Sequence, residues 1–280
     1  MDMNDKIEAY LKKSANIAYD VANKLCKNGI VDTKCLWYHS VWQYLRLLNV
    51  VSSPTWHDEF YNKELLNALN NKLEANILIS GTADYSMLAY VIDVSKKSNA
   101  KKTNIYVLDT CNTPLYLCEW YAKNNNVVIN TINQNIMLYE NKNFYDIICT
   151  DAFLTRFSKD MVSKVISKWS TLLKKNGKII TTIRVHYDNE SKITNDEINN
   201  FVDKVKYIAE KNKEYIKLKP IEIAKLTENY ARKMKSNNIG NEKDIINFFN
   251  SFNIHYNIKI LCGELRESKY IELVAEKINN

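Results

Sequence analysis

Glycine and proline are scarce in this sequence, with only 5 and 3 among 280 residues. Disordered, low-complexity and collagen-like chains are rich in these residues, so their scarcity excludes those classes. No apolar run approaches the roughly 18 residues of a membrane-spanning helix, and the first residues lack the apolar core of a secretory signal. We therefore expect a soluble, cytoplasmic globular protein without a membrane partner.

Cysteine pairs at metal-binding spacing are also missing. The six cysteines show no CxxC spacing and lie mostly inside apolar segments. Structural zinc sites are usually recognised by such spacing, and cytosolic thiols stay reduced. The sequence therefore predicts buried, reduced thiols and no metal site. The six residues are Cys26, Cys35, Cys111, Cys118, Cys149 and Cys262.

Positive charge is present but is not concentrated anywhere. The formal net charge is +7, yet the lysines are spread over the chain and alternate with acidic residues. Nucleic-acid-binding proteins gather their basic residues on one helix or stripe. Charge alone therefore indicates no nucleic-acid partner.

The hydrophobic period changes near residue 73. Over residues 1–72 apolar residues recur every three or four positions, which predicts helices, with Asp32 and Thr33 as candidates for a helix N-cap. After residue 73, short apolar runs alternate with amphipathic helices. These runs predict strands over 76–80, 104–108, 127–131, 146–150 and 178–185.

Alternating strands and helices predict a doubly wound, Rossmann-like α/β fold with a mostly parallel sheet. Two further runs, 254–261 and 270–276, predict a β-hairpin with its turn around Gly263. The hairpin brings the sheet to seven strands, with an antiparallel last strand at its edge.

We expect two parts in the chain, a helical lid over 1–72 and the sheet domain over 73–280. The sheet domain carries a polar, helical insertion over about 186–250. This insertion is either a substrate cap or the surface of a homodimer.

A turn of small residues follows the first predicted strand, beginning at Gly81. Such a turn lets a ligand approach the backbone, and the next helix offers its free N–H groups. The second predicted strand ends in Asp109, 28 positions later. A carboxylate at this place can accept from both ribose hydroxyls of a nucleotide. The alternatives are a structural turn and a helix-capping aspartate.

Four segments resemble, in order and spacing, the class I S-adenosylmethionine (SAM)-dependent methyltransferase family. They are ILISGTADYS, IYVLDTCNTPLYLCEWYAK, FYDIICTDAF and LLKKNGKIITTIRV, within about residues 75–185. The resemblance implies SAM as the cofactor and a transferase activity. It also implies that the Gly81 turn faces the methionine and ribose, that Asp109 binds the ribose hydroxyls and that Thr110 flanks the adenine.

The sequence departs from the family pattern at two places. The E/DxGxGxG motif is SGTADY here, so two glycine positions carry other residues, and we expect Asp84 to contact the cofactor's ammonium group. An acidic residue after the third strand is replaced by Asn135, whose carbonyl oxygen can accept from the adenine amine. The expected cofactor-binding residues are Gly81, Thr82, Ala83, Asp84, Tyr85, Asp109, Thr110, Asn135 and Asp151.

An aromatic segment over 35–48 carries the residues expected on the acceptor side. His39, Gln43 and Arg46 are spaced to share one face of a helix. Aromatic rings nearby suit a sulfonium, because a cation over a ring face is stabilised by roughly 0.5–2 kcal/mol. The alternative is plain core packing with Arg46 at the surface. The expected substrate-binding residues are Trp42, Gln43, Arg46 and Arg184.

Methyl transfer requires a positioned nucleophile and, for some acceptors, removal of a proton. The expected catalytic residues are Tyr38, His39 and Asp151, and Asp151 as a helix N-cap is the alternative. Tyr85, Arg184 and His186 are further candidates.

The expected function is methylation of a small molecule or natural-product intermediate. One alternative is cyclisation or cleavage of SAM itself with release of methylthioadenosine, and another is a non-catalytic binding subunit. The Asn/Asp-Pro-Pro-aromatic motif of many nucleic-acid methylases is absent, since DAFL follows the fourth predicted strand.

Overall fold

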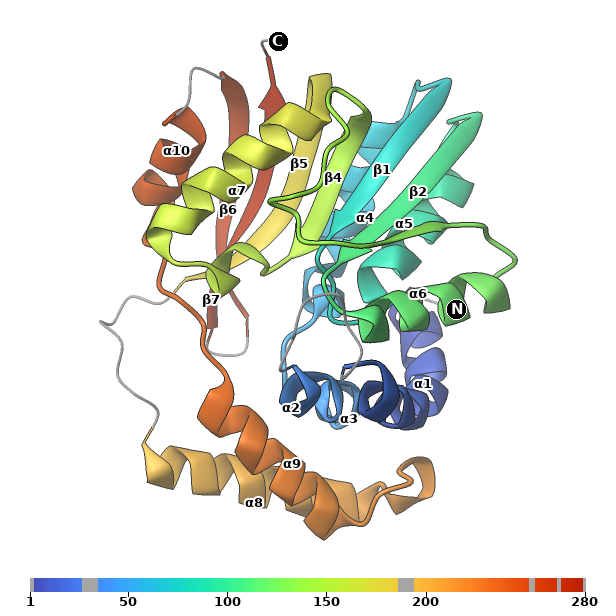
Figure 1. Ribbon diagram of the computed structural model, residues 1–280, viewed down its shortest axis with the longest axis vertical. Helices are drawn as coiled ribbons and strands as arrows, with labels where there is room; N and C mark the ends of the chain where they lie inside the picture. Colours follow the sequence, from blue (N-terminus) through green and yellow to red (C-terminus); the bar gives the residue numbers. More distant parts are fainter. Residues whose placement is uncertain (1–2, 27–34, 186–193, 252–254, 266–267, 279–280) are drawn as a thin grey trace.

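The computed structural model describes residues 3–26, 35–185, 194–251, 255–265 and 268–278 (Figure 1). Asp32, Thr33 and His186 lie outside these residues. The strands are β1 Glu74–Ser80, β2 Lys102–Asp109, β3 Asn130–Asn133, β4 Tyr145–Asp151, β5 Leu173–Val185, β6 Tyr256–Leu265 and β7 Ser268–Lys277. The α-helices are α1 Met3–Leu25, α2 Leu36–His39, α3 Trp42–Leu47, α4 Asp58–Leu69, α5 Ser86–Lys97, α6 Asn112–Asn124, α7 Lys159–Leu172, α8 Asn195–Lys211, α9 Pro220–Lys233 and α10 Glu242–Asn250. Short 3-10 helices are η1 Pro54–His57, η2 Leu154–Arg156 and η3 Lys213–Tyr215.

The described strands form one seven-stranded sheet in the order β3-β2-β1-β4-β5-β7-β6. Strands β1 to β5 pair in parallel, whereas β7 is antiparallel to both β5 and β6. The predicted Rossmann-like sheet with an antiparallel last strand is confirmed. The antiparallel strand is not at the edge, however, because β7 lies between β5 and β6.

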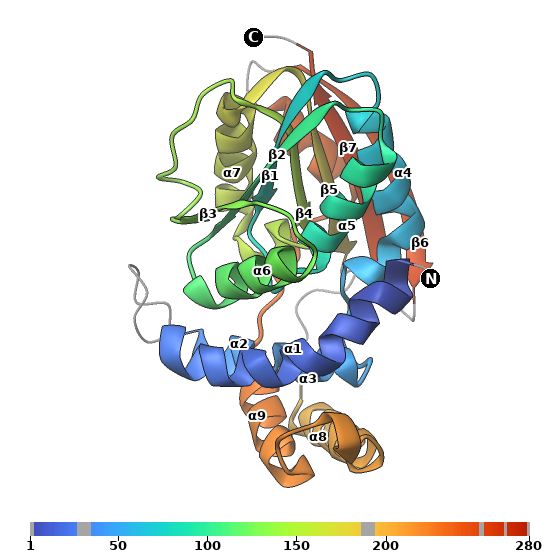
Figure 2. The ribbon, with the colours of Figure 1, turned by 90° about the vertical axis from the view of Figure 1, so that its right-hand side faces the viewer.

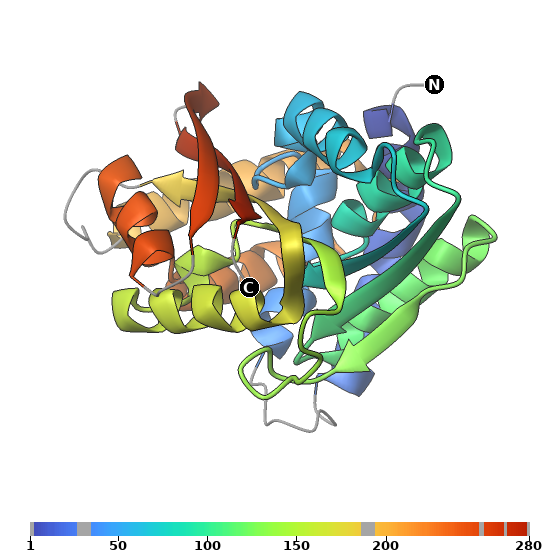
Figure 3. The ribbon, with the colours of Figure 1, turned by 90° about the horizontal axis from the view of Figure 1, so that it is seen from above.

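Helices cover both faces of the sheet (Figures 1 and 3). On one face, Tyr61 of α4 and Tyr90 of α5 pack with Ile77 of β1. On the other face, Trp169 of α7 and Phe249 of α10 pack in a second cluster. Central strands are therefore buried on both sides, which explains why they are continuous apolar runs rather than alternating ones.

The N-terminal helices form a layer against the carboxyl edge of the parallel strands. Figure 1 shows α1, α2 and α3 beside this edge, with α8 and α9 packed on their far side. Leu45 of α3 and Ile223 of α9 belong to the same apolar cluster, which joins the two layers. Helix α4 instead packs on the sheet, as Figure 2 also shows. No helix in the described parts of the chain has the length and apolar character needed to cross a bilayer.

Three local expectations differ from the structure. The third strand starts at Asn130 rather than 127, since Val128 is 91% exposed. Gly263 pairs with Tyr270 inside the hairpin and is not in its turn. The aromatic segment 35–48 is two short helices, α2 and α3, rather than one.

Candidate active site

The turn after β1 needs a glycine at its first position. Gly81 has a φ of 74°, in the left-handed region that side chains disfavour, and a Cβ there would overlap the ring of Phe153. Its N–H donates to the carbonyl of Leu108 at 2.8 Å, which ties the turn to the end of β2. The left-handed backbone and the close contact with Phe153 therefore both require a glycine at this position.

Asp109 lies at the end of β2, next to this turn. Its Oδ2 accepts from the N–H of Thr82 at 3.0 Å, and its Oδ1 accepts from the N–H of Cys111 at 2.8 Å. Burial raises the pKa of Asp109 to about 6, against these two amides, which lower it. Each carboxylate oxygen keeps one further lone pair. The carboxylate can therefore accept two more hydrogen bonds.

Asp84 and Arg46 form a buried ion pair between the turn and α3. Arg46 Nη1 donates to Asp84 Oδ2 at 2.5 Å, and the two residues are 4% and 3% exposed. Asp84 Oδ1 accepts from the N–H and the hydroxyl of Ser86 at 2.8 and 2.6 Å. Burial acts to raise the pKa of Asp84, but Arg46 and Ser86 outweigh it and hold that pKa below its ordinary value.

This pair joins one residue expected to contact the cofactor with one expected to contact the substrate. Arg46 Nη2 is buried and has no hydrogen-bond partner among the described residues. The carboxylate oxygen Glu8 Oε1 lies 4.0 Å from it. The guanidinium therefore has donors left for an anionic group of a ligand.

Asp151, at the end of β4, belongs to a hydrogen-bonded group that the sequence did not indicate. Its Oδ1 accepts from the hydroxyl of Tyr61 at 2.9 Å and from that of Thr182 at 2.6 Å. Tyr61 lies on α4 and Thr182 on β5, and both are fully buried. The next residue, Ala152, has a φ of 48°, a strained conformation of a kind that clusters at functional sites.

Several buried polar atoms near the α2–α3 segment have no partner in the described part of the chain. They are His39 Nδ1, Ser40 Oγ, Trp42 Nε1, both amide atoms of Gln43, and His57 Nε2. Each such atom costs about 1–3 kcal/mol if nothing pairs with it. A concentration of them on one segment indicates a ligand site.

His57, at the end of η1, is held by a carboxylate. Its Nδ1 lies 2.8 Å from Glu272 Oε1, and its ring packs edge-on against Tyr270. The residue is 3% exposed, and its Nε2 is one of the unpartnered atoms. A histidine held in this way is oriented for proton transfer at Nε2.

Two asparagines lie at the end of β3. The side-chain oxygen of Asn135 accepts from the N–H of Met137 at 2.9 Å, so it already has a partner. Asn133 donates to the carbonyl of Asp109 at 3.1 Å, and its own Oδ1 is buried without a partner in the described chain. Asn133, which the sequence did not single out, offers the more available acceptor.

Aromatic side chains of α2 and α3 pack against Tyr230 of α9. The rings of Tyr38 and Trp42 are parallel at 5.0 Å, and Tyr230 lies 5.9 Å from Tyr38. Arg156 lies over the Tyr38 ring at 5.6 Å. Burial raises the pKa of Tyr38 well above its ordinary value, so its hydroxyl stays protonated and can donate a hydrogen bond.

The remaining residues that the sequence analysis expected at the site are Tyr85, Arg184, Thr110 and Ala83. Tyr85 is fully buried and stacks on Tyr121 at 4.6 Å, with its hydroxyl donating to the carbonyl of Ile7. Arg184 is exposed and donates to Ser268. Thr110 is half-buried beside Asp109, and Ala83 packs against the helical layer.

A cavity of about 320 Å³ lies between α1, α2 and α9. Its lining residues are Tyr19, Asn23, Leu36, Trp37, Ser40, Leu226, Asn229 and Lys233. None of them belongs to the turn after β1 or to the ends of the strands. We therefore do not identify this cavity with the place where a cofactor would bind.

Two solved structures illustrate what this chain is similar to. The magnesium protoporphyrin IX methyltransferase of Synechocystis PCC 6803, with bound S-adenosylhomocysteine (SAH), aligns with a TM-score of 0.52 at 11% identity, over 84% of this chain and 93% of that one. The 1,6-didemethyltoxoflavin-N1-methyltransferase of Burkholderia thailandensis aligns with a TM-score of 0.51 at 11% identity, over 80% of this chain and 81% of that one. It was solved with 1,6-didemethyltoxoflavin and SAH.

No protein-family model matches the sequence, and no curated protein does. The similarity is therefore one of fold. The chain has the class I SAM-dependent methyltransferase fold, as the resemblance of its sequence segments implied.

Proposed function

We propose that this protein is a SAM-dependent methyltransferase that acts on a small molecule. The observation that carries the proposal is the Asp109 carboxylate, which accepts from the N–H of Thr82 in the Gly81 turn, at the carboxyl edge of a methyltransferase-type sheet. Ligands of open α/β sheets bind at this edge. The two structural neighbours described above were solved with SAH.

In this proposal the cofactor lies along the ends of β1, β2 and β3. The Gly81 turn faces the methionine and ribose, Asp109 accepts from the two ribose hydroxyls, and Asn133 and Asn135 lie at the adenine. Asp84 orients Arg46, whose free Nη2 donates to a carboxylate of the incoming ligand. SAM supplies an activated methyl group on its sulfonium.

The acceptor is proposed to lie between the cofactor and the α2–α3 segment. Its nucleophile attacks the methyl carbon, the sulfur–methyl bond breaks, and the sulfur keeps the electron pair. Asp151 and the Nε2 of His57 are the candidates to take the acceptor's proton. Tyr38 and Gln43 are proposed to orient the acceptor through hydrogen bonds.

Small-molecule specificity is supported by the covering of the sheet edge. The helices α1 to α3 lie over that edge and α8 with α9 lie over them, so helices cover the edge against a macromolecular acceptor (Figure 1). Both structural neighbours are named for small acceptors, 1,6-didemethyltoxoflavin and magnesium protoporphyrin IX.

The test is to incubate the purified protein with SAM alone, with binding followed by calorimetry and products by mass spectrometry. We expect binding without turnover. A second incubation adds methyl-deuterated SAM and a small-molecule extract, in which we expect SAH and one deuteromethylated product. Release of methylthioadenosine without an acceptor would overturn methyl transfer in favour of SAM cyclisation or cleavage. Failure to bind either SAM or SAH would overturn both reactions.

Binding of SAH is expected to weaken as the pH falls through about 6, the pKa of Asp109. The ionised carboxylate is the stronger acceptor, and its population falls about tenfold for each pH unit below the pKa. Calorimetric titrations between about pH 5 and pH 8 measure the effect. Burial raises the pKa of Asp109 in the folded protein, so this carboxyl stabilises the fold at low pH and its contribution is lost as the pH rises through about 6. Unfolding driven by Asp109 therefore cannot explain a loss of affinity at acid pH. Equal affinity at both ends of the range would contradict the assignment.

A further inference from the structure

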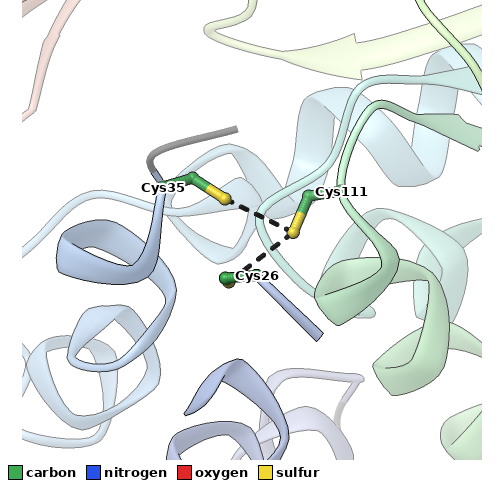
Figure 4. A group of neighbouring side chains, drawn as sticks. All are labelled: Cys26, Cys35 and Cys111. Atoms are coloured by element: carbon green, nitrogen blue, oxygen red, sulfur yellow. Dashed lines mark hydrogen bonds between the residues drawn. The ribbon is translucent and has the colours of Figure 1, made fainter. Parts of the chain in front are cut away.

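Three cysteines from distant parts of the sequence meet in the structure. Cys26 follows α1, Cys35 precedes α2, and Cys111 is the N-cap of α6. The Cys111 sulfur lies 3.7 Å from that of Cys26 and 3.5 Å from that of Cys35, and all three sulfurs are within 4.8 Å of one another (Figure 4). No two of the three cysteines have the CxxC spacing of a metal-binding motif, so the sequence analysis did not predict this cluster.

The spacing of the sulfurs fits a shared metal ion. A tetrahedral zinc ion holds thiolates at about 2.3 Å, which places any two sulfurs about 3.8 Å apart. A disulfide would need about 2.05 Å, and none of these three cysteines forms one. The two sulfur–sulfur distances that involve Cys111 are close to this expected separation. A small movement of Cys26 and Cys35 would therefore place three sulfurs at three of the four ligand positions of a tetrahedral zinc ion.

A candidate for the fourth position lies beside the cluster. His39, at the end of α2, is 8% exposed, and its Nδ1 has no partner in the described part of the chain. The imidazole of His39 contacts the Cys111 thiol. Cysteine thiolates and a neutral imidazole are the usual ligands of a structural zinc ion.

Packing alone does not account for this cluster. Ala22 and Leu36 are its apolar neighbours, and the hydroxyl of Thr113 lies 3.2 Å from the Cys26 sulfur. The other buried thiols, Cys118 and Cys149, lie in the apolar core of the sheet instead. Any small apolar residue would fill the space of one thiol, but only thiols can bind a metal together.

We propose that Cys26, Cys35 and Cys111, with His39 as the fourth ligand, bind one structural Zn²⁺ ion. The three thiols lose their protons to solvent as the ion binds, and the imidazole binds in its neutral form. The ion fastens the ends of α1 and α2 to the N-cap of α6, two residues after Asp109. The N-terminal helical layer is then fixed to the edge of the sheet, and this inference does not depend on the proposed function.

Metal content is the first measurement. The full-length protein is reduced, saturated with zinc and desalted, and its zinc is determined by plasma mass spectrometry. We expect one zinc ion per chain, and replacement by cobalt should give the intense visible bands of tetrahedral coordination with sulfur-to-metal charge transfer. A chain without bound zinc, or a cobalt spectrum without the sulfur bands, would overturn the proposal.

Matched cysteine variants locate the site. Cys26→Ser, Cys35→Ser and Cys111→Ser should each weaken zinc binding by about 100-fold or more, since they remove a ligand itself rather than a supporting group. Cys118→Ser, which is equally buried, and Cys262→Ser, which is exposed, should keep one zinc per chain. Equal loss of zinc in Cys118→Ser would overturn the assignment.

The wild-type protein gives a readout that no folding defect can imitate. Thiols are alkylated with and without bound zinc, and the modified residues are identified by mass spectrometry. Zinc should protect Cys26, Cys35 and Cys111 and leave the labelling of Cys262 unchanged. A His39→Asn variant should retain the sulfur bands of cobalt but shift its ligand-field bands. Labelling of the three thiols at the same rate with zinc present would overturn the proposal.

Discussion

Replacing Asp109 with asparagine is expected to weaken the binding of SAH by about 100-fold. The carboxylate is the proposed acceptor for two ribose hydroxyls, and hydrogen bonds to a charged acceptor are worth about 1.5–3 kcal/mol each. An amide has no charge and only one acceptor oxygen, so it cannot pair with both hydroxyls equally well. Calorimetric titration with SAH measures the change without turnover.

The control for this variant must separate binding from local structure. Asp109 also accepts from the N–H groups of Thr82 and Cys111, and an asparagine NH₂ would face one of them. Urea unfolding of the free protein measures that effect independently. Asp160→Asn, an exposed residue in the first turn of α7, should leave the affinity unchanged. An Asp109→Asn protein that folds and binds SAH as tightly as the wild type would remove Asp109 from the site.

The positions that the sequence could identify are those where local chain geometry decides the outcome. Gly81 directly follows β1 and Asp109 ends β2, and the carboxyl ends of parallel strands share one edge. Residue type and strand position were therefore enough to bring them together. The start of β3 was misjudged because Val127 and Ile129 pack inward while Val128 is 91% exposed, and an apolar run does not reveal which of its members the sheet hydrogen-bonds.

Contacts between distant segments could not be predicted in the same way. His57 and Glu272 are 215 residues apart, and Tyr61 reaches Asp151 across 90 residues. In an amphipathic helix, the sequence does not distinguish a tyrosine that only fills the core from one whose hydroxyl bonds to a site residue. The difference depends on which strand ends lie next to it. The sequence analysis assigned Arg46 to the substrate and Asp84 to the cofactor's ammonium group, but their pairing depends on how α3 lies over the edge of the sheet.

Removing Arg46 is expected to have the largest effect on stability. Arg46→Met keeps most of the volume but leaves Asp84 buried without its counter-charge, and breaking a buried pair from one side costs about 3–5 kcal/mol. Because Arg46 holds the pKa of Asp84 below its ordinary value, the pair's stabilisation is present above the unfolded-state pKa and is lost as the pH falls through the folded one. Urea unfolding at neutral pH, with the slope checked for two-state behaviour, measures the loss.

A double-mutant cycle then separates the pair from its surroundings. Adding Asp84→Asn to Arg46→Met removes the stranded charge, so the double variant should be more stable than Arg46→Met alone. The matched comparison is Arg232→Met on α9, whose ion pair with Glu228 is half exposed and should contribute less than about 1 kcal/mol. If the stability losses of the single variants Arg46→Met and Asp84→Asn add up to that of the double variant, the two residues act independently. The ion pair would then not hold α3 to the turn. If the double variant recovers stability but not SAH affinity, the result would support the proposed second role of Arg46, in which its Nη2 donates to the ligand.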